Sequence, residues 1–299
     1  MKAIGQQRGG MTNAELSRQL DIPKSTCTYI LTRLEGEKFV VRHKITGRYT
    51  VGLNTLSLAH DALREIRFPA IAEPTLYRLA ERTGLVAILG AVEGDRVLTV
   101  DRVESPDFMR DSAEKGRSRW RFYPTREHRG IGAEYSLHAS ALGRVVLAHL
   151  PPQDLSEILE KIPLTKFTPK TIVSKAELLI ELERIRERGY AITDQQSHLD
   201  TRAIAAPIVE ANGEVRASVC IAGSRLSPAF RGLSGLITSV QEAGKEISRC
   251  LSRGSMPDGQ IAPVAATSVP YGTARETVST TSAGLLHGRR SASFNHYRF

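Results

Sequence analysis

Residues 12–36 read TNAELSRQLDIPKSTCTYILTRLEG, and they contain the start signals of two successive helices. Thr12 and Glu15 have the spacing of a capping box, which predicts a helix that begins just after Thr12. Pro23 predicts the start of a second helix, because the first helical turn leaves its amide positions without intrahelical partners. Two short helices separated by a brief break indicate a helix-turn-helix.

The second helix has two faces of different chemistry. An apolar stripe at i, i+3, i+4 and i+7 predicts the buried side, formed by Cys27, Ile30, Leu31 and Leu34. The opposite side carries cations, short hydroxyls and one aromatic ring, on Lys24, Ser25, Thr26, Thr28, Tyr29, Thr32 and Arg33. Such a face can enter the major groove of double-stranded DNA, where cations bind phosphates or guanine edges and hydroxyls reach base edges. The alternative is a generic helical hairpin with a solvated basic face.

A β-hairpin is expected next, because β-prone runs at 39–42 and 48–51 flank a turn that contains Gly47. Its basic residues Arg42, Lys44 and Arg48 would follow the sugar-phosphate backbone as a wing. The whole chain has 41 Lys and Arg against 32 Asp and Glu, a net charge of +9. Nine basic and only four acidic residues lie within 1–60, so the positive charge is concentrated at the proposed DNA-binding end.

The rest of the 299-residue chain predicts a second domain of the α+β class. A helix at about 53–66 connects it to the first domain. Its strands come in hairpins, which indicates an antiparallel sheet, and they are expected at 85–92, 96–103, 190–193, 203–210 and 215–222. Helices are expected at 70–83, 138–149, 152–161, 174–188 and 231–251. We expect a long loop over 105–134 and, because its composition is rich in Ser, Thr, Ala, Gly and Pro, a disordered tail over 254–299.

Several classes of protein are disfavoured. No apolar run approaches the roughly 20 residues that span a bilayer, so no membrane partner is expected. Three cysteines are too few for a disulfide framework, which favours the reducing cytoplasm. No carboxylate pair, nucleophile–base set or metal-ligand spacing stands out, so we expect neither an enzyme nor a metal or cofactor.

Three segments of the sequence form a recognisable combination. The first, in the helix-turn-helix, is Leu20-Asp21-Ile22-Pro23-Lys24-Ser25-Thr26. The others are Leu137-His138-Ala139-Ser140-Ala141-Leu142-Gly143-Arg144 and Ile204-Ala205-Ala206-Pro207-Ile208. In these segments the chain resembles the IclR family of bacterial transcription regulators. The resemblance implies a winged helix-turn-helix over 1–52, a linker helix over 53–68 and a GAF-like effector domain over 69–253. Protomers would pair through their DNA-binding domains.

The resemblance also implies that a small carboxylic or aromatic acid binds the second domain and changes the affinity for operator DNA. The expected effector-binding residues are Tyr135, Ala141, Leu142, Gly143, Asp194, Ala203, Cys220 and Ala222. A helix N-terminus near residues 140–143 would attract a carboxylate. The small residues could instead serve only close packing of a helix on a sheet.

One departure from the family pattern affects function. Only about ten residues precede Thr12 where a full first helix is usual, so the first helix is expected to be truncated. The alternative function is therefore a dimeric ligand sensor with impaired DNA binding.

Overall fold

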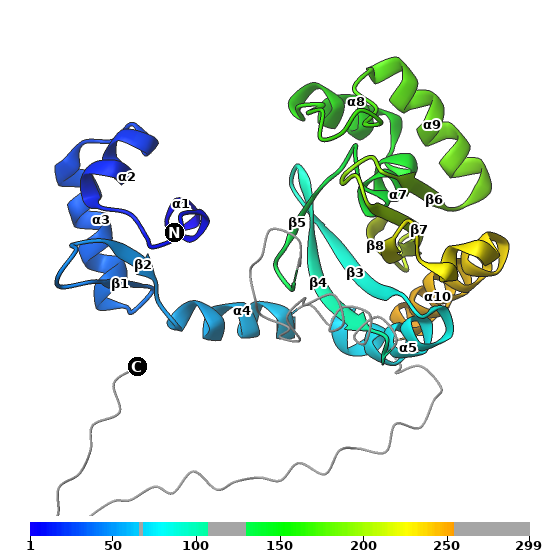
Figure 1. Cartoon of the computed structure of the whole chain (residues 1–299), viewed down its shortest axis with the longest axis horizontal. Helices are drawn as coiled ribbons and strands as arrows, with labels where there is room; N and C mark the ends of the chain where they lie inside the picture. The colour runs from blue at the N-terminus through cyan, green and yellow to red at the C-terminus, as the bar shows by residue number, and fades with distance from the viewer. Residues whose placement is uncertain (66–67, 107–129, 254–299) are drawn as a thin grey trace, which may run out of the picture. The chain divides into compact units, whose positions relative to one another are not determined.

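The computed structural model describes residues 1–65, 68–106 and 130–253, which include two domains (Figure 1). The N-terminal domain is a winged helix-turn-helix. It contains the helices α1 (Lys2–Gln6), α2 (Asn13–Leu20) and α3 (Lys24–Gly36), and the antiparallel strands β1 (Val40–Arg42) and β2 (Tyr49–Val51).

The capping box predicted from Thr12 and Glu15 is present at the start of α2. The Thr12 hydroxyl accepts from the Glu15 amide at 3.2 Å, and the Glu15 carboxylate accepts from the Thr12 amide at 2.8 Å. Helix α2 ends at Asp21, whose φ of +50° breaks the helical path. Helix α3 then begins directly after Pro23. The turn of the hairpin contains Gly47 with a φ of +66°, as a left-handed turn position favours.

A small apolar core holds this domain together, and it is formed by Ile4, Met11, Leu16, Cys27, Leu31, Val40 and Tyr49. The first helix is short, as expected, yet α1 places Ile4 in the core with only 2% of its surface exposed. The prediction that Ile30 is buried was wrong, because it is 44% exposed. The buried stripe of α3 is narrower than the sequence suggested, and Leu34 only borders it.

The C-terminal domain is an α+β domain with an antiparallel sheet, as the sequence predicted, and the sheet has six strands, of which five were predicted. Helix α4 (Asn54–Glu65) connects to it. The strand order is β5-β4-β3-β8-β7-β6, and every neighbouring pair is antiparallel. The strands are β3 (Val86–Glu93), β4 (Arg96–Glu104), β5 (Glu134–Ser136), β6 (Ala191–Asp194), β7 (Thr201–Val209) and β8 (Val215–Ser224).

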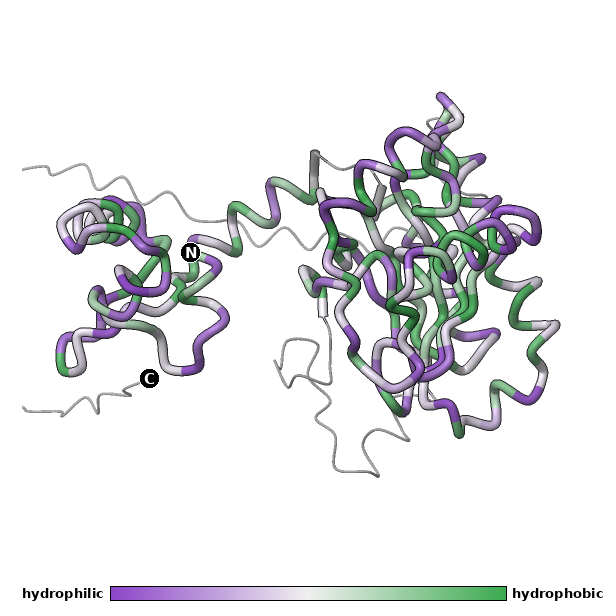
Figure 2. The backbone as a smooth tube through the Cα atoms, turned by 90° about the horizontal axis from the view of Figure 1, so that it is seen from above, coloured by the Kyte–Doolittle hydropathy of each residue, from purple (hydrophilic) through white to green (hydrophobic). Residues whose placement is uncertain are grey.

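Helices cover both faces of this sheet (Figure 1). Helices α5 (Phe68–Thr83) and α10 (Leu233–Arg253) lie side by side on one face, and the short 3-10 helix η1 (Pro228–Gly232) precedes α10. Helices α7 (Ala141–His149), α8 (Pro152–Lys161) and α9 (Lys175–Arg188) cover the other. Figure 2 shows the interior of this domain as mainly hydrophobic and its outer turns as mainly hydrophilic. Each face of the sheet has its own apolar core.

Two expectations fall wholly or partly outside the described residues. The loop predicted over 105–134 includes 107–129, which are not described, and the predicted tail over 254–299 lies outside the described ranges altogether. Strand β5 begins at the last residue of that predicted loop, and the sequence analysis missed this edge strand. The domain boundaries at residues 52 and 68 stay predictions. Among the helices of the described residues, none has the length and apolar character that crossing a membrane requires.

Candidate functional site

The first candidate site is the outer face of α3. All seven residues predicted there are exposed: Lys24, Ser25, Thr26, Thr28, Tyr29, Thr32 and Arg33. On the opposite side of the helix, Cys27 and Leu31 are each 3% exposed, so the core fixes which face points outward. The Arg33 guanidinium lies 5.4 Å from the centre of the Tyr29 ring, a distance that allows a cation–π contact. This face therefore offers a cation and a largely exposed aromatic side chain together.

Two of the predicted DNA contacts also bind within the protein. The Thr28 hydroxyl accepts from the Asn13 side chain at 2.6 Å and donates to the Lys24 carbonyl at 2.8 Å. Arg48 donates to the Gly10 carbonyl at 3.2 Å and forms an ion pair with Glu15 at 3.1 Å. These bonds join α2 to α3 and β2 to the α1–α2 connection. Both side chains thus have a structural role, whereas Arg42 and Lys44 are exposed on the wing.

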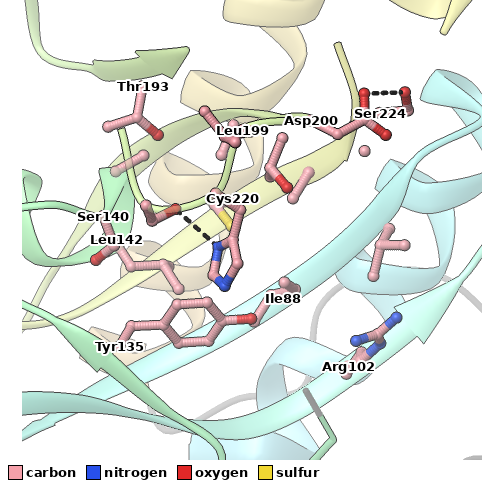
Figure 3. A pocket seen from close by; sticks show the side chains of 18 residues that line it. Ile88, Arg102, Tyr135, Ser140, Leu142, Thr193, Leu199, Asp200, Cys220 and Ser224 are labelled. Atoms are coloured by element: carbon pink, nitrogen blue, oxygen red, sulfur yellow. Dashed lines mark hydrogen bonds between the residues drawn. The ribbon is translucent and has the colours of Figure 1, made fainter. Parts of the chain in front are cut away.

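The second candidate site is a cavity of about 360 Å³ between the sheet and α7, large enough for a small-molecule effector (Figure 3). Six of the eight predicted effector-binding residues line it: Tyr135, Ala141, Leu142, Ala203, Cys220 and Ala222. The sequence analysis missed much of the remaining lining, which includes Val86, Ile88, Arg102, Thr193, Ser197, His198, Leu199, Thr201 and Ser224. Asp200, which was not among the predicted site residues, also lines the cavity.

The register of the strands explains how these residues come together. Side chains directly opposite one another on neighbouring strands share a face. One row across the sheet pairs Ile88 with both Arg102 and Cys220. The adjacent row runs through Val86, Ala222, Ala203 and Thr193. The two rows form the floor of the cavity. The small side chains of Ala203, Cys220 and Ala222 leave space above this floor.

Asp194 is not part of the described lining, and alternation along β6 gives the reason. Thr193 faces the cavity, so its neighbour Asp194 points to the opposite face of the sheet. There Asp194 pairs with Arg202 at 2.5 Å. The guanidinium of Arg202 lies 5.6 Å from the centre of the Phe230 ring, which belongs to the core under α5 and α10. The sequence analysis thus predicted Asp194 as an effector-binding residue, whereas its neighbour Thr193 faces the cavity.

Gly143 is also outside the described lining, and its surroundings indicate a packing role. A Cβ atom there would lie 2.4 Å from Cα and 2.5 Å from the carbonyl oxygen of Leu137. Its amide donates to the Ser140 hydroxyl at 3.0 Å, which caps α7. The close-packing alternative left open above therefore describes this glycine.

The first turn of α7 forms one end of the cavity. Ser140, Ala141 and Leu142 line it, and they are the cap and first two residues of the helix. The amides of a first helical turn have no intrahelical acceptor, and the helix dipole adds positive potential. A ligand carboxylate fits this position. In the floor, burial raises the pKa of the Cys220 thiol to about 12, which keeps it neutral.

The loop between β6 and β7 forms the opposite wall and is fixed by neighbouring threonines. The Thr168 hydroxyl donates to the Gln195 carbonyl at 2.5 Å, and the Thr171 hydroxyl donates to the Gln196 carbonyl at 2.7 Å. Gln195 itself has a φ of +60°. The wall formed by Ser197–Asp200 is therefore held in place from the α8–α9 connection.

Two family models match the chain. One describes the IclR helix-turn-helix domain and matches residues 1–44, and the other describes the C-terminal domain of the bacterial transcriptional regulator IclR and matches residues 60–249. A winged helix-turn-helix followed by an effector domain defines a class of ligand-responsive DNA-binding regulators. The chain belongs to the IclR family of transcriptional regulators.

Individual relatives agree with this assignment. The HTH-type transcriptional regulator BhcR of Paracoccus denitrificans is 32% identical over 80% of each chain. The transcriptional repressor IclR of Escherichia coli is 27% identical over 74% of this chain and 75% of its own length. The crystal structure of Thermotoga maritima IclR superposes with a TM-score of 0.60 at 26% identity, over 83% of this chain and 94% of its own.

A further solved structure shares the fold. It is an IclR homologue from Microbacterium hydrocarbonoxydans complexed with 4-hydroxybenzoate. It has a TM-score of 0.65 at 22% identity, over 85% of this chain and 96% of its own.

Proposed function

We propose that the exposed face of α3 enters the major groove of an operator DNA, with the wing on the adjacent backbone. The observation that carries this is the division of α3 into a buried side and a fully exposed side of cations and hydroxyls. Lys24, Ser25, Thr26, Tyr29, Thr32 and Arg33 would reach bases and phosphates, and Arg42 and Lys44 would bind phosphates. Arg48 stabilises the domain instead, because its guanidinium binds Glu15 and Gly10.

The test is fluorescence anisotropy with duplexes from the DNA upstream of the gene, measured over a series of salt concentrations. Arg33→Ala should lower the affinity by about 1–3 kcal/mol if the side chain reads a guanine edge. The matched control is Arg184→Ala, which removes the same charge from an exposed position on α9. Affinity should fall steeply with salt as phosphate contacts release counterions. Equal affinities of Arg33→Ala and Arg184→Ala would exclude α3 as the reading helix.

We further propose that a small organic acid binds the cavity under α7 with its carboxylate at the first turn of that helix. Support comes from the volume of about 360 Å³, the mainly apolar floor and the start of α7, where the helix dipole adds positive potential beside Ala141 and Leu142. Carboxylate binding also agrees with the 4-hydroxybenzoate complex of the Microbacterium homologue. This compound is therefore the first probe.

A cavity-filling substitution tests the site. Ala222→Met should abolish the thermal stabilisation that a bound acid produces, because the longer side chain occupies the cavity floor. Ala176→Met on the exposed surface of α9 is the matched control and should respond as the parent does. Stabilisation of Ala222→Met by the acid equal to that of the parent would place the binding site elsewhere.

Effector binding would act by shifting the relative positions of two DNA-binding domains in a homodimer, which changes their match to paired half-sites. Such a regulator works in the cytoplasm, beside the chromosome. The alternative, a dimeric sensor with impaired DNA binding, predicts stabilisation by the acid together with no DNA binding even at low salt. The presence of Ile4 in the N-terminal core supports the DNA-binding interpretation, since the short α1 still completes that core.

A further inference from the structure

The end of the cavity opposite α7 carries its own polar groups. In Figure 3, Ser140 and Leu142 lie on one side of the cavity, and Asp200, Ser224 and Arg102 lie on the other. A ligand whose carboxylate sits at α7 therefore directs its far end toward a carboxylate and a guanidinium. The chemistry of this far end determines which acids fit.

Asp200 is held in position by its neighbours. The Ser224 hydroxyl donates to its Oδ1 at 3.0 Å, and the Arg225 amide donates to its backbone carbonyl at 2.9 Å. Within the described ranges, no lysine or arginine forms an ion pair with this side chain. Its charge is therefore balanced only by a hydroxyl and by solvent at the rim, so a hydrogen-bond donor on a ligand would be favoured there.

Arg102 differs, because its positive charge is already matched. Its guanidinium donates to Glu104 at 2.6 Å, and the Arg102 side chain is only 14% exposed. A second ligand carboxylate at this end would meet a neutralised cation and the unpaired charge of Asp200. A hydroxyl is better suited, since it is uncharged and can donate a hydrogen bond to the Asp200 carboxylate.

We propose that the effector is a monocarboxylic acid that carries a hydroxyl at the end remote from its carboxylate, and that Asp200 selects it. The inference rests on the proposed function, which places the carboxylate at α7. It adds that acids without the hydroxyl bind more weakly and that dicarboxylic acids are rejected. Asp200 thereby acts as the specificity-determining residue of the cavity.

Isothermal titration of the full chain with matched acids tests this. The aromatic probes are 3-phenylpropanoate, its para-hydroxy form and its para-carboxy form, and the aliphatic probes are hexanoate, 6-hydroxyhexanoate and adipate. In at least one set the hydroxy acid should bind about tenfold more tightly than the unsubstituted acid. This factor is the gain expected from one hydrogen bond to a charged group at a partly solvated position. The dicarboxylate should bind more weakly than the unsubstituted acid.

The variant Asp200→Asn should reduce the tenfold preference to about twofold and narrow the penalty against the dicarboxylate. Glu160→Gln, on an exposed position of α8, removes the same charge and should keep the parent preferences. If unsubstituted and hydroxylated acids bind equally well, the inference fails while the proposed carboxylate site stands. If no probe binds, the proposed site fails and the inference fails with it. If Asp200→Asn keeps the full preference, another residue selects the hydroxyl.

Discussion

Gly143 of α7 lies so close to Leu137 that a Cβ atom would stand 2.5 Å from the Leu137 carbonyl oxygen. The obstacle is backbone, which cannot move aside as a flexible side chain could. We therefore expect Gly143→Ala to lower the free energy of unfolding by about 3 kcal/mol, since overpacking displaces α7 from the sheet. Urea denaturation measures this directly.

Gly235 is the matched control, because it is also the third residue of a helix, α10, and no atom lies within 4 Å of the position that a Cβ atom would take there. Gly235→Ala should leave the stability unchanged or raise it by up to about 1 kcal/mol, through the higher helix propensity of alanine. Equal effects of the two substitutions would show that helix propensity, and not the approach to Leu137, governs Gly143.

Because Arg48 forms an ion pair with Glu15 and Lys44 does not, we expect Arg48 to stabilise the domain and Lys44 to bind DNA. Hydrogen bonds with Thr12, opposed by partial burial and assisted by Arg48, hold the pKa of Glu15 below its usual value. Arg48→Ala should lower the melting temperature of the N-terminal domain by about 2–4 °C. Lys44→Ala, exposed at the wing tip, should leave the melting temperature unchanged and weaken DNA binding. The reverse pattern would assign the DNA contact to Arg48.

The wall of the cavity depends on threonine hydroxyls that bind backbone carbonyls. Thr171→Val keeps the shape of the side chain but removes the donor to the Gln196 carbonyl and the acceptor of the Phe167 and Thr168 amides. Exchange of the backbone amide hydrogens in residues 195–200 should speed up by about tenfold. This factor corresponds to about 1.4 kcal/mol, the loss of the one hydrogen bond that Thr171 makes to this segment. Thr238→Val on exposed α10, whose hydroxyl bonds only within its own helix, should leave that segment unchanged. Unaltered exchange in Thr171→Val would mean that other contacts hold the wall.

Much of the fold could be predicted from the sequence because its signals are local. The capping box at Thr12, the proline at the start of α3 and the Gly47 turn each depend on a few neighbouring residues. The long-range features could not be predicted in the same way. Whether Thr193 or Asp194 faces the cavity depends on the register of β6 against β7, and a shift of one residue reverses the answer.

The same limit applies to the far end of the cavity. Arg102 on β4 and Asp200 in the loop before β7 are almost a hundred positions apart in the sequence, and only the β4-β3-β8-β7 order brings them to one cavity. Neither side chain belongs to a recognisable local motif. The acid-binding end at α7 could be predicted, because a capped helix start is visible in the sequence, whereas the end that we propose selects the ligand could not.

His138 gives the C-terminal domain a defined dependence on pH. It is 1% exposed, its Nδ1 lies 2.8 Å from the Ser136 hydroxyl and its Nε2 lies 3.0 Å from the Thr165 carbonyl. A carbonyl can only accept, so the neutral ring carries its proton on Nε2. Burial lowers the pKa of His138 below its usual value, and the nearby charge of Arg144 acts in the same direction.

The sign of the effect follows from linkage. Well above the usual histidine pKa of about 6.5 the ring is neutral in both the folded and the unfolded chain, so the stability is fully present. As the pH falls below that value, the unfolded chain binds a proton that the folded chain does not, and stability is lost. The urea midpoint should therefore decrease between pH 7.5 and pH 5. His138→Gln should flatten this decrease, while His60→Gln, exposed on α4, should retain it. A pH profile of His138→Gln as steep as that of the parent would assign the loss to other groups.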